Sequence, residues 1–331
     1  MREPASWWRP GSKSLLSPFA AVYGAAAWLR MQASGTSAGV PVICFGNLTV
    51  GGAGKTPAAL AAARLLLKVH ERPFFLSRGY GGRLAGPVRV NIATDRAADV
   101  GDEPLLLARL APTIVARDRV AGARFARSAG ASVIVMDDGF QNPSLAKDLA
   151  ILLVDGARGI GNGRIIPAGP LRAPLEIQIA HAKAIVVVGP PHGATAVLDV
   201  ARRYGITIFH GRLEPDANSL AALGRRKVLA FAGIGNPDKF YATLNGAGVD
   251  VAECASFADH HRYTPADAQA LIARAAAKNL VLITTEKDLV RLAGEPSLAS
   301  LAAHASALPV RLVIEEAERF RQMVLAAVKR S

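Results

Sequence analysis

A glycine-rich segment with a lysine and a threonine lies where an apolar stretch gives way to an alanine- and leucine-rich one. The segment, residues 49–56, follows the β-type run 41–45 and precedes the helical run 58–67. Glycines placed there let backbone N–H groups turn inward around phosphate oxygens at a helix N-terminus. Lys55 is expected to reach the β- and γ-phosphates of a nucleoside triphosphate, and Thr56 to place its hydroxyl on Mg²⁺. The predicted nucleotide-binding residues are Thr49, Val50, Gly51, Gly52, Ala53, Gly54, Lys55 and Thr56.

This segment departs from the usual phosphate-loop pattern at one position. The pattern is Gly-x-x-x-x-Gly-Lys-Ser/Thr, and Thr49 stands where its first glycine would be. The alternative is a glycine-rich surface turn that happens to contain Gly-Lys-Thr. The strand expected before the segment and the helix expected after it favour the phosphate loop.

The chain is long enough for two domains and is strongly basic. Its 331 residues exceed what one hydrophobic core usually serves, and 51% of them are apolar. A net charge of +13 favours anionic partners. The sequence contains neither a Lys/Arg run for duplex backbones nor interleaved aromatics for single strands, so we expect no nucleic-acid partner. Two cysteines, Cys44 and Cys254, indicate no disulfide framework and no cysteine metal site.

Apolar, β-branched runs alternate with helical stretches along the chain. This alternation predicts an α/β fold of the phosphate-loop NTPase type, whose mostly parallel sheet is covered by helices on both faces. A second alternating set at 226–306 predicts a smaller α/β domain. The extended segments 206–213 and 308–314 are expected to pair antiparallel as a two-stranded linker. The strands predicted for the larger sheet are residues 41–45, 73–76, 113–116, 132–136, 150–154 and 184–188.

These patterns divide the chain into four parts. An N-terminal helical segment at 1–35 precedes the phosphate-loop core at 36–215, and the smaller domain follows at 226–306. The remaining residues, 307–331, are predicted to supply a linker strand and a closing helix that packs back on the core.

Residues 14–29 contain no charge and lie between basic residues. The segment is shorter than the ~20 apolar residues that a spanning helix needs. Tryptophan suits the head-group region and cations suit anionic lipid, so we predict an interfacial helix that holds the chain at a membrane surface. A cleaved signal peptide and an ordinary helix packed on the core are the alternatives. The flanking cations are Arg9, Lys13 and Arg30, and the tryptophans are Trp7, Trp8 and Trp28.

Two adjacent carboxylates follow a predicted strand about 80 residues beyond the phosphate loop. The strand 132–136 ends in Asp137-Asp138-Gly139. Mg²⁺ prefers oxygen ligands and keeps several waters, so a carboxylate delivered beside a triphosphate suits it. We therefore predict Asp137 and Asp138, with Thr56, as metal-binding residues. The alternative is an ordinary Asp-Asp-Gly turn after a strand.

A third acidic group opens the helical run 105–110. The sequence there is Gly101-Asp102-Glu103-Pro104. One interpretation makes Asp102 a general base, because a sugar hydroxyl is a poor nucleophile and a positioned carboxylate contributes ~10²–10⁴ in rate. The other makes it a helix start, with a carboxylate capping free N–H groups. Spacing alone leaves both open.

Two loops after predicted strands carry candidate substrate-binding side chains. In the loop 77–82, Arg78 is placed to hold a phosphate and Tyr80 to stack on a sugar. In the loop 167–172, Arg172 is offered to the nucleotide or to the acceptor. A flexible surface loop is the alternative for the first of them.

The predicted smaller domain contributes a histidine pair. His260 and His261 precede a helix, and closure of the domains would let His260 polarise or orient the Asp102 carboxylate. A metal-binding pair and a surface turn are the alternatives. The segment 284–288 is only loosely similar to a guanine-reading Asn-Lys-x-Asp, because position 289 is Leu, so GTP is disfavoured as the ligand.

Taken together, these motifs resemble those of the tetraacyldisaccharide 4'-kinase family, the lipid A 4'-kinases of Gram-negative bacteria. The similarity extends over nearly the whole chain. Its motifs are Gly46 to Pro57, Ser77 to Gly81, Gly101 to Pro104, Asp137 to Gln141, Pro167 to Arg172, Asp259-His260 and Thr284 to Asp288.

The resemblance implies ATP- and Mg²⁺-dependent phosphorylation of the 4'-hydroxyl of an acylated glucosamine disaccharide 1-phosphate. It places the reaction at the cytoplasmic face of the inner membrane and makes 36–215 a kinase core. It also implies that Asp102 is the base, tuned by His260 or its neighbour, with Lys55 acting on the phosphates. Family roles at two positions do not carry over, because this chain has Asn142 where His is common and Ala173 where Glu is common.

Another function class also uses a phosphate loop. A switch ATPase or GTPase acting on a protein partner is the main alternative to a kinase. Partitioning proteins of that class often carry an early loop lysine where this chain has Val50, and metal carriers show Cys/His clusters that the sequence lacks. A nucleotide-dependent regulator of nucleic acid would need a basic recognition element. For a kinase of this kind we predict a lipid substrate and no obligate protein partner.

Overall fold

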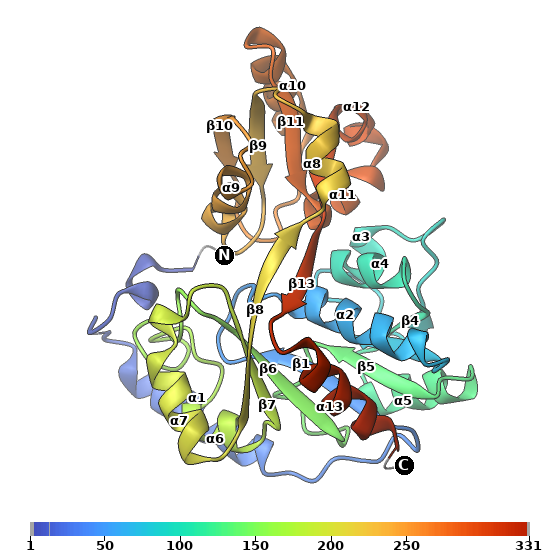
Figure 1. Cartoon of the computed structure of the whole chain (residues 1–331), viewed down its shortest axis with the longest axis vertical. Coiled ribbons are helices and arrows are strands. Elements are labelled where there is room, and N and C mark those ends of the chain that lie inside the picture. The colour runs from blue at the N-terminus through green and yellow to red at the C-terminus, as the bar shows by residue number, and fades with distance from the viewer. Residues whose placement is uncertain (1–2, 13, 330–331) are drawn as a thin grey trace.

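Two β-sheets organise the chain, and two neighbouring strands run from the larger part toward the smaller (Figure 1). The structure is a computed structural model that describes residues 3–12 and 14–329. Lys13, one of the cations that we expected to flank the N-terminal helix, lies outside these residues.

The larger sheet has nine strands. Their bounds are β1 Val42–Asn47, β2 Pro73–Ser77, β3 Val88–Arg89, β4 Thr113–Val115, β5 Val133–Asp137, β6 Leu149–Asp155, β7 Ala184–Val188, β8 Thr207–Pro215 and β13 Val310–Ile314. Across the sheet the order is β13-β8-β7-β6-β1-β5-β2-β4-β3. Only the two edge strands, β13 and β3, run antiparallel to their neighbours. The central strands are buried along nearly their whole length, as parallel strands covered on both faces are.

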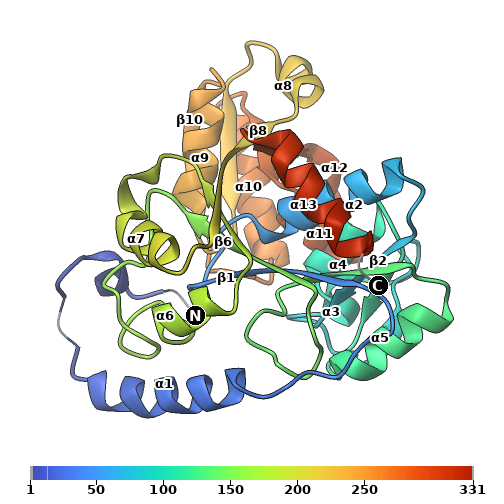
Figure 2. The ribbon, with the colours of Figure 1, turned by 60° about the horizontal axis from the view of Figure 1, so that its bottom comes forward.

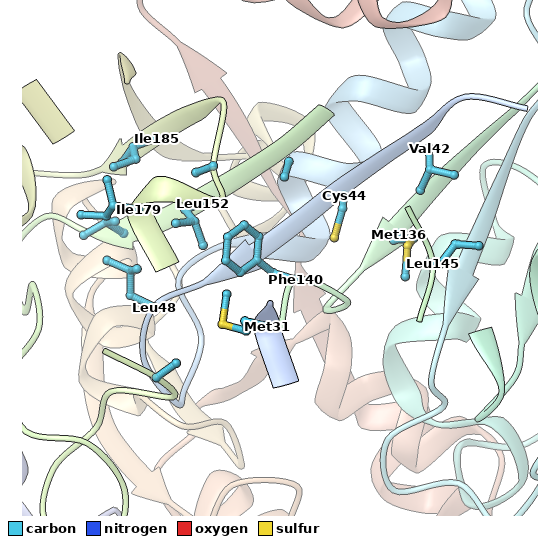
Figure 3. Close-up of a cluster of buried hydrophobic side chains, with 14 of the residues drawn as sticks. Met31, Val42, Cys44, Leu48, Met136, Phe140, Leu145, Leu152, Ile179 and Ile185 are labelled. Carbon is cyan, nitrogen blue, oxygen red and sulfur yellow. The ribbon is translucent and has the colours of Figure 1, made fainter. Parts of the chain in front are cut away.

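Helices cover both faces of this sheet, which confirms the predicted fold class. Helices α2 Lys55–Lys68 and α13 Ala317–Lys329 pack on one face. The opposite face is covered by α1 Ser17–Met31, α5 Arg119–Ser128, α6 Leu175–Ala180 and α7 Thr195–Arg203. Figure 3 shows the core beneath this second group, where Met31 and Phe140 lie beside Cys44 of β1. Two short helices, α3 Ala97–Val100 and α4 Asp102–Ala108, lie near β4.

Helix α1 lies along the outside of the core, at the bottom of the view in Figure 2. It buries one narrow face, made of Ala20, Gly24, Ala27 and Met31. Its other face is apolar and exposed, made of Phe19, Val22, Tyr23, Trp28 and Leu29. Among the described residues, no helix is both long and apolar enough to cross a membrane. A 3₁₀ turn, η1 Ala5–Trp8, precedes α1, and the Trp7 carbonyl accepts a hydrogen bond from the Asn162 N–H group at 2.7 Å.

The smaller sheet has four parallel strands in the order β10-β9-β11-β12. Their bounds are β9 Val228–Ala232, β10 Val251–Ser256, β11 Val281–Thr285 and β12 Ala305–Leu308. The accompanying helices are α8 Ala217–Leu223, α9 Pro237–Gly246, α10 Pro265–Ala277, α11 Glu286–Ala293 and α12 Ala299–His304, with the 3₁₀ turns η2 Pro191–Gly193 in the core and η3 Pro296–Leu298 here. Helix α10 begins with a capping box in which Thr264 and Asp267 bond each other's backbone N–H groups.

Strands β8 and β13 pair antiparallel, from Val310 opposite Pro215 to Ile314 opposite Gly211, as the linker prediction required. The sequence pattern did not separate β12 from β13, because only Pro309 stands between them. A proline has no N–H group to donate to a strand ladder, and here it marks the passage from one sheet to the other. Strand β12 extends beyond residue 306, where the smaller domain was predicted to end. We therefore propose that this domain extends to residue 308.

Candidate active site

The glycine-rich segment connects the end of β1 to the start of α2. Gly51 and Gly54 both have a φ of +90°, which side chains other than glycine rarely adopt. The Asn47 side chain closes the loop by donating to the Gly51 carbonyl at 2.8 Å, and Lys55 Nζ donates to Asn47 Oδ1 at 3.2 Å. The loop thus has the strand, turn and helix start that phosphate binding requires, and Lys55 is held inside it.

The Thr56 hydroxyl lies against the first of the two adjacent carboxylates. It donates to Asp137 Oδ2 at 2.8 Å, while Asp137 Oδ1 is buried without a hydrogen-bond partner among the described residues. Burial, followed by the negative charge of Glu103, raises the pKa of Asp137 to about 7. A buried carboxylate oxygen without a donor suits a hard cation. The described residues hold no cluster of three or more His, Cys, Asp or Glu that forms a metal cage, so phosphate oxygens and water would complete the coordination of such a cation.

The second carboxylate, Asp138, faces the cations of the loop. Its Oδ1 accepts from Arg172 Nη1 at 2.7 Å, and its Oδ2 lies 3.9 Å from Lys55 Nζ. Burial acts to raise the pKa of Asp138, but the charges of Lys55 and Arg172 outweigh it and hold this pKa below its usual range. Arg172 also donates through Nε to the Thr49 carbonyl at 3.1 Å. Arg172 therefore lies beside the phosphate loop.

Asp102 is the first residue of α4, and it is only 3% exposed. Its Oδ1 accepts from the Glu103 N–H at 2.8 Å, and its Oδ2 lies 3.2 Å from His260 Nδ1 and 2.7 Å from Arg291 Nε. Burial opposes its ionisation, but the hydrogen bond from His260 and the charges of Arg291 and Lys287 outweigh burial and hold the pKa of Asp102 well below its usual range. The Asp102 side chain thus does more than start a helix: it joins the two parts of the molecule.

The two neighbouring histidines have different surroundings. The ring of His260 lies edge-on to Tyr80, with 4.8 Å between centroids, and its Nε2 is 3.8 Å from Asp259 Oδ1. The ring of His261 points elsewhere: it stacks on Phe257 and places Nε2 at 3.0 Å from Asp267 Oδ2. His260 is therefore the histidine that contacts Asp102.

The two candidates in the loop after β2 have different environments. Tyr80 is 62% exposed and reaches His260 through its ring edge. Arg78 is exposed at the surface, and its charge lowers the pKa of the Arg119 guanidinium after the larger effect of burial. Tyr80 thus joins the Asp102 centre, whereas Arg78 remains at the surface.

Sequence reasoning did not assign a role in the site to three charged residues near Asp102, namely Glu103, Lys287 and Arg291. Lys287 and Arg291 of α11 bond Glu103 and Asp102 of α4, respectively. The available signal was their spacing, because residues four apart share one face of a helix. The segment 284–288 carries one of the family's motifs and is only loosely similar to a guanine-reading one; neither pattern indicates a contact with α4.

The smaller sheet's loops also approach the phosphate loop. A Cβ atom added to Gly235, just after β9, would lie 3.5 Å from the Gly51 Cα atom and 3.4 Å from Asp259 Oδ2. The phosphate loop and the Asp102 centre therefore lie in one region between the two parts of the molecule.

Known proteins are similar in sequence to this chain over nearly its whole length. The sequence model of one family, described as tetraacyldisaccharide-1-P 4'-kinase, matches residues 12–329. The chain belongs to this family. A tetraacyldisaccharide 4'-kinase of Rhodopseudomonas palustris strain BisB18 is 54% identical over 98% of this chain and 95% of its own length. One from Afipia carboxidovorans is 51% identical over 100% and 98%, respectively.

A solved structure of a family member has the same fold. It is described as the "apo" form of LpxK from Aquifex aeolicus in complex with ATP, and it is similar to this chain with a TM-score of 0.70 and 28% identity. The match covers 95% of this chain and 98% of that one. The family and its members are described as kinases, which confirms the resemblance drawn from the motifs. Nothing in these comparisons supports a switch ATPase or GTPase.

Proposed function

We propose that this chain transfers the γ-phosphoryl group of ATP to the 4'-hydroxyl of a tetraacyl glucosamine disaccharide 1-phosphate, a step of lipid A biosynthesis. The observation that carries the proposal is the meeting of two acidic centres. Thr56 and Asp137 form one centre beside the phosphate loop. Asp102 and His260 form the other, and Glu103, next to Asp102, is near enough for its charge to raise the pKa of Asp137. The centre proposed to bind ATP and the centre proposed to bind the sugar hydroxyl therefore lie close together.

The phosphate loop would hold the nucleotide. Its N–H groups and the Lys55 ammonium are suited to the β- and γ-phosphates, and Lys55 is already oriented by Asn47. Thr56, Asp137 and Asp138 would hold Mg²⁺, because they offer hard oxygen atoms and one buried carboxylate oxygen has no donor in the described part of the chain. The ion would neutralise charge that develops on the phosphate oxygens.

Asp102 would accept the proton of the sugar hydroxyl. A carboxylate oxygen has two lone pairs, so Oδ1 keeps one acceptor position besides its bond from the Glu103 N–H. The lowered pKa of Asp102 keeps it ionised, and a weak base suffices where the transition state of phosphoryl transfer is loose. His260 would orient the carboxylate. Positioning, rather than base strength, is then the main contribution of this pair.

The remaining candidates fit an anionic sugar lipid. Tyr80, exposed beside His260, would stack on the sugar, and Arg78 in the same loop would meet a substrate phosphate. Arg172 would act on the nucleotide side through Thr49 and Asp138. In this proposal Tyr80 contacts the sugar, Arg78 contacts the substrate phosphate and Arg172 contacts the nucleotide.

We further propose that α1 holds the enzyme at the cytoplasmic face of the inner membrane. Its exposed face is apolar, and Arg30 lies in its last turn. A helix of this kind lies in the interfacial plane of a bilayer with its apolar face in the lipid. The lipid substrate would then reach the site without leaving the membrane.

Transfer of label from [γ-³²P]ATP tests the proposal. The purified protein with Mg²⁺ should label a tetraacyl disaccharide 1-phosphate rather than release free phosphate. Lys55→Ala should abolish transfer, and Asp102→Asn should lower kcat by ~10²–10⁴ with a much smaller change in the ATP KM. His260→Gln should slow transfer, whereas His261→Gln, its matched control, should not. Unchanged turnover of Asp102→Asn would remove Asp102 from the role of base.

A further inference from the structure

Helix α11 of the smaller domain presents two cations to two adjacent carboxylates of the core. Arg291 Nε donates to Asp102 Oδ2 at 2.7 Å, and Lys287 Nζ donates to Glu103 Oε1. The two cations are one helical turn apart, and the two acids begin α4. The Arg291 side chain is 10% exposed and the Asp102 side chain 3%, so water screens this pair little.

The guanidinium of Arg291 is fixed from its own side of the contact. Its Nη1 donates to Asp288 Oδ1 at 2.8 Å and to the Gly233 carbonyl at 2.7 Å. Asp288 is in turn held by the Tyr263 hydroxyl at 2.9 Å and by the Thr285 hydroxyl at 2.6 Å. Residues of the smaller domain therefore hold the planar, charged Arg291 guanidinium in place beside Asp102.

We propose that Arg291 is a positioning residue for phosphoryl transfer: it sets the orientation and charge of the Asp102 carboxylate from the opposite domain. The inference rests on the proposed role of Asp102 as the base. Because Asp102 and Arg291 stand on different domains, the base has its full set of partners only while the domains are closed.

Arginine suits this role better than a point charge does. Its planar fork bonds Asp102, Asp288 and the Gly233 carbonyl at once, which fixes the plane of the Asp102 carboxylate. His260 bonds the same oxygen, Oδ2, so both partners leave the second lone pair of Oδ1 for the sugar hydroxyl. Loss of Arg291 would leave Asp102 held by His260 and by the Glu103 N–H group, but without the guanidinium that fixes the plane of its carboxylate.

A double-mutant cycle on the full-length enzyme tests the proposal. The variants are Arg291→Gln, Arg291→Lys, Asp102→Asn and Asp102→Asn/Arg291→Gln, with kcat and the ATP KM measured by label transfer. Lys239→Gln is the matched control, because Lys239 of α9 bonds Asp155 at the end of β6 at 2.8 Å and so also joins the two domains, away from Asp102. Thermal unfolding with and without ATP shows that each variant folds and binds nucleotide.

Arg291→Gln should lower kcat by at least about 10-fold, within the ~10²–10⁴ that a positioned base contributes, and change the ATP KM by less than about threefold. Arg291→Lys should recover part of the loss. In the Asp102→Asn background the same change should have almost no further effect, since groups that act as a unit are not additive.

Two results would overturn the proposal. An equal loss in both backgrounds would make Arg291 a packing residue, and an equal loss from Lys239→Gln would assign the effect to domain closure alone. The double variant keeps the test valid if Arg291→Gln alone is unstable, because it removes both members of the pair. Full turnover of Asp102→Asn would instead show that the proposed base is wrong, an outcome distinct from failure of the Arg291 proposal.

Discussion

Asp137 and Asp138 show how strongly local surroundings separate two neighbouring carboxylates. Asp137 ends the buried strand β5, and burial with the Glu103 charge raises its pKa to about 7. Asp138, one residue later, has a positive φ of 58° and turns toward Lys55 and Arg172, whose charges overcome burial and lower its pKa. Of the two, only Asp138 forms salt bridges with cationic side chains in the described part of the chain. Ionisation of Asp137 is therefore unfavourable in the folded protein at pH values below about 7.

The stability of the nucleotide-free protein should depend on Asp137 in a defined direction. Between pH ~4, where an unfolded aspartate ionises, and pH 7, the folded protein binds more protons at this residue, so stability falls as the pH rises. Asp137→Asn removes that cost and should raise the melting temperature at pH 8 by about 2 °C or more, with less gain at pH 5. Scanning calorimetry without Mg²⁺ measures this.

Asp138→Asn provides the opposite control. Its lowered pKa means that the ionised form contributes stability above pH ~4, which is lost as the pH falls through the folded value. The substitution should therefore lower the melting temperature at pH 8. A melting temperature that falls in both variants would contradict the assignment of different roles to the two residues.

At the scale of single elements, α1 combines two of the expected alternatives. It packs on the core like an ordinary helix, and a Cβ atom on Gly24 would come within 2.8 Å of Ile165 Cδ1. Its outer face is nevertheless apolar along the whole helix. Nothing in an uncharged sequence marks which face is buried, because small residues occur all along it; the spacing of Ala20, Gly24, Ala27 and Met31 shows the buried face only once the core is known.

Polar substitutions on the outer face of α1 should weaken membrane binding without unfolding the protein. Phe19, Val22 and Leu29 are 66%, 73% and 62% exposed, respectively. The triple change to Ser should reduce co-sedimentation with anionic vesicles by about 10-fold or more, since each side chain buried in lipid contributes about 1.5–3 kcal/mol. Transfer to a detergent-solubilised acceptor should persist. Undiminished vesicle binding would refute the anchor.

At the scale of the whole molecule, charge holds the two domains together. Lys287 and Arg291 of α11 pair with Glu103 and Asp102 of α4. Glu286 Oε1 of α11 lies 4.0 Å from Arg109 Nη1, just after α4, and Lys239 of α9 pairs with Asp155. The side chains in the Lys287, Arg291 and Lys239 pairs are partly or fully buried between the two domains. We therefore expect closure of the domains to assemble the proposed site.

Removal of two of these cations should open the cleft. The variant Lys239→Gln/Lys287→Gln should have a larger radius of gyration in solution scattering and an unchanged far-UV circular dichroism spectrum. Lys227→Gln is the control, because its exposed partner, Asp250, lies 3.9 Å away within the smaller domain. An unchanged radius in the double variant would show that other contacts suffice for closure.

Local features of this chain were predictable, whereas the contacts between domains were not, apart from that of His260 with Asp102. The phosphate loop, the buried strands and the closing helix 317–329 follow from patterns within a few residues. Lys287 and Arg291 bond acids that lie 184 and 189 residues earlier, so no local pattern indicates them. His260, and not His261, contacts Asp102, and it does so from a backbone conformation with a positive φ of 53° that the sequence does not indicate. Such orientation follows from tertiary packing.

Strands β8 and β13 pair edge to edge where they run toward the smaller domain. A ribbon of two strands flexes readily across its broad face and resists flexing within its own plane. We therefore expect the smaller domain to move most easily across the broad face of this ribbon, with α9 and α11 moving together. Movement of this domain away from the core would separate Arg291 and His260 from Asp102, so the proposed base would lack these partners while the cleft is open.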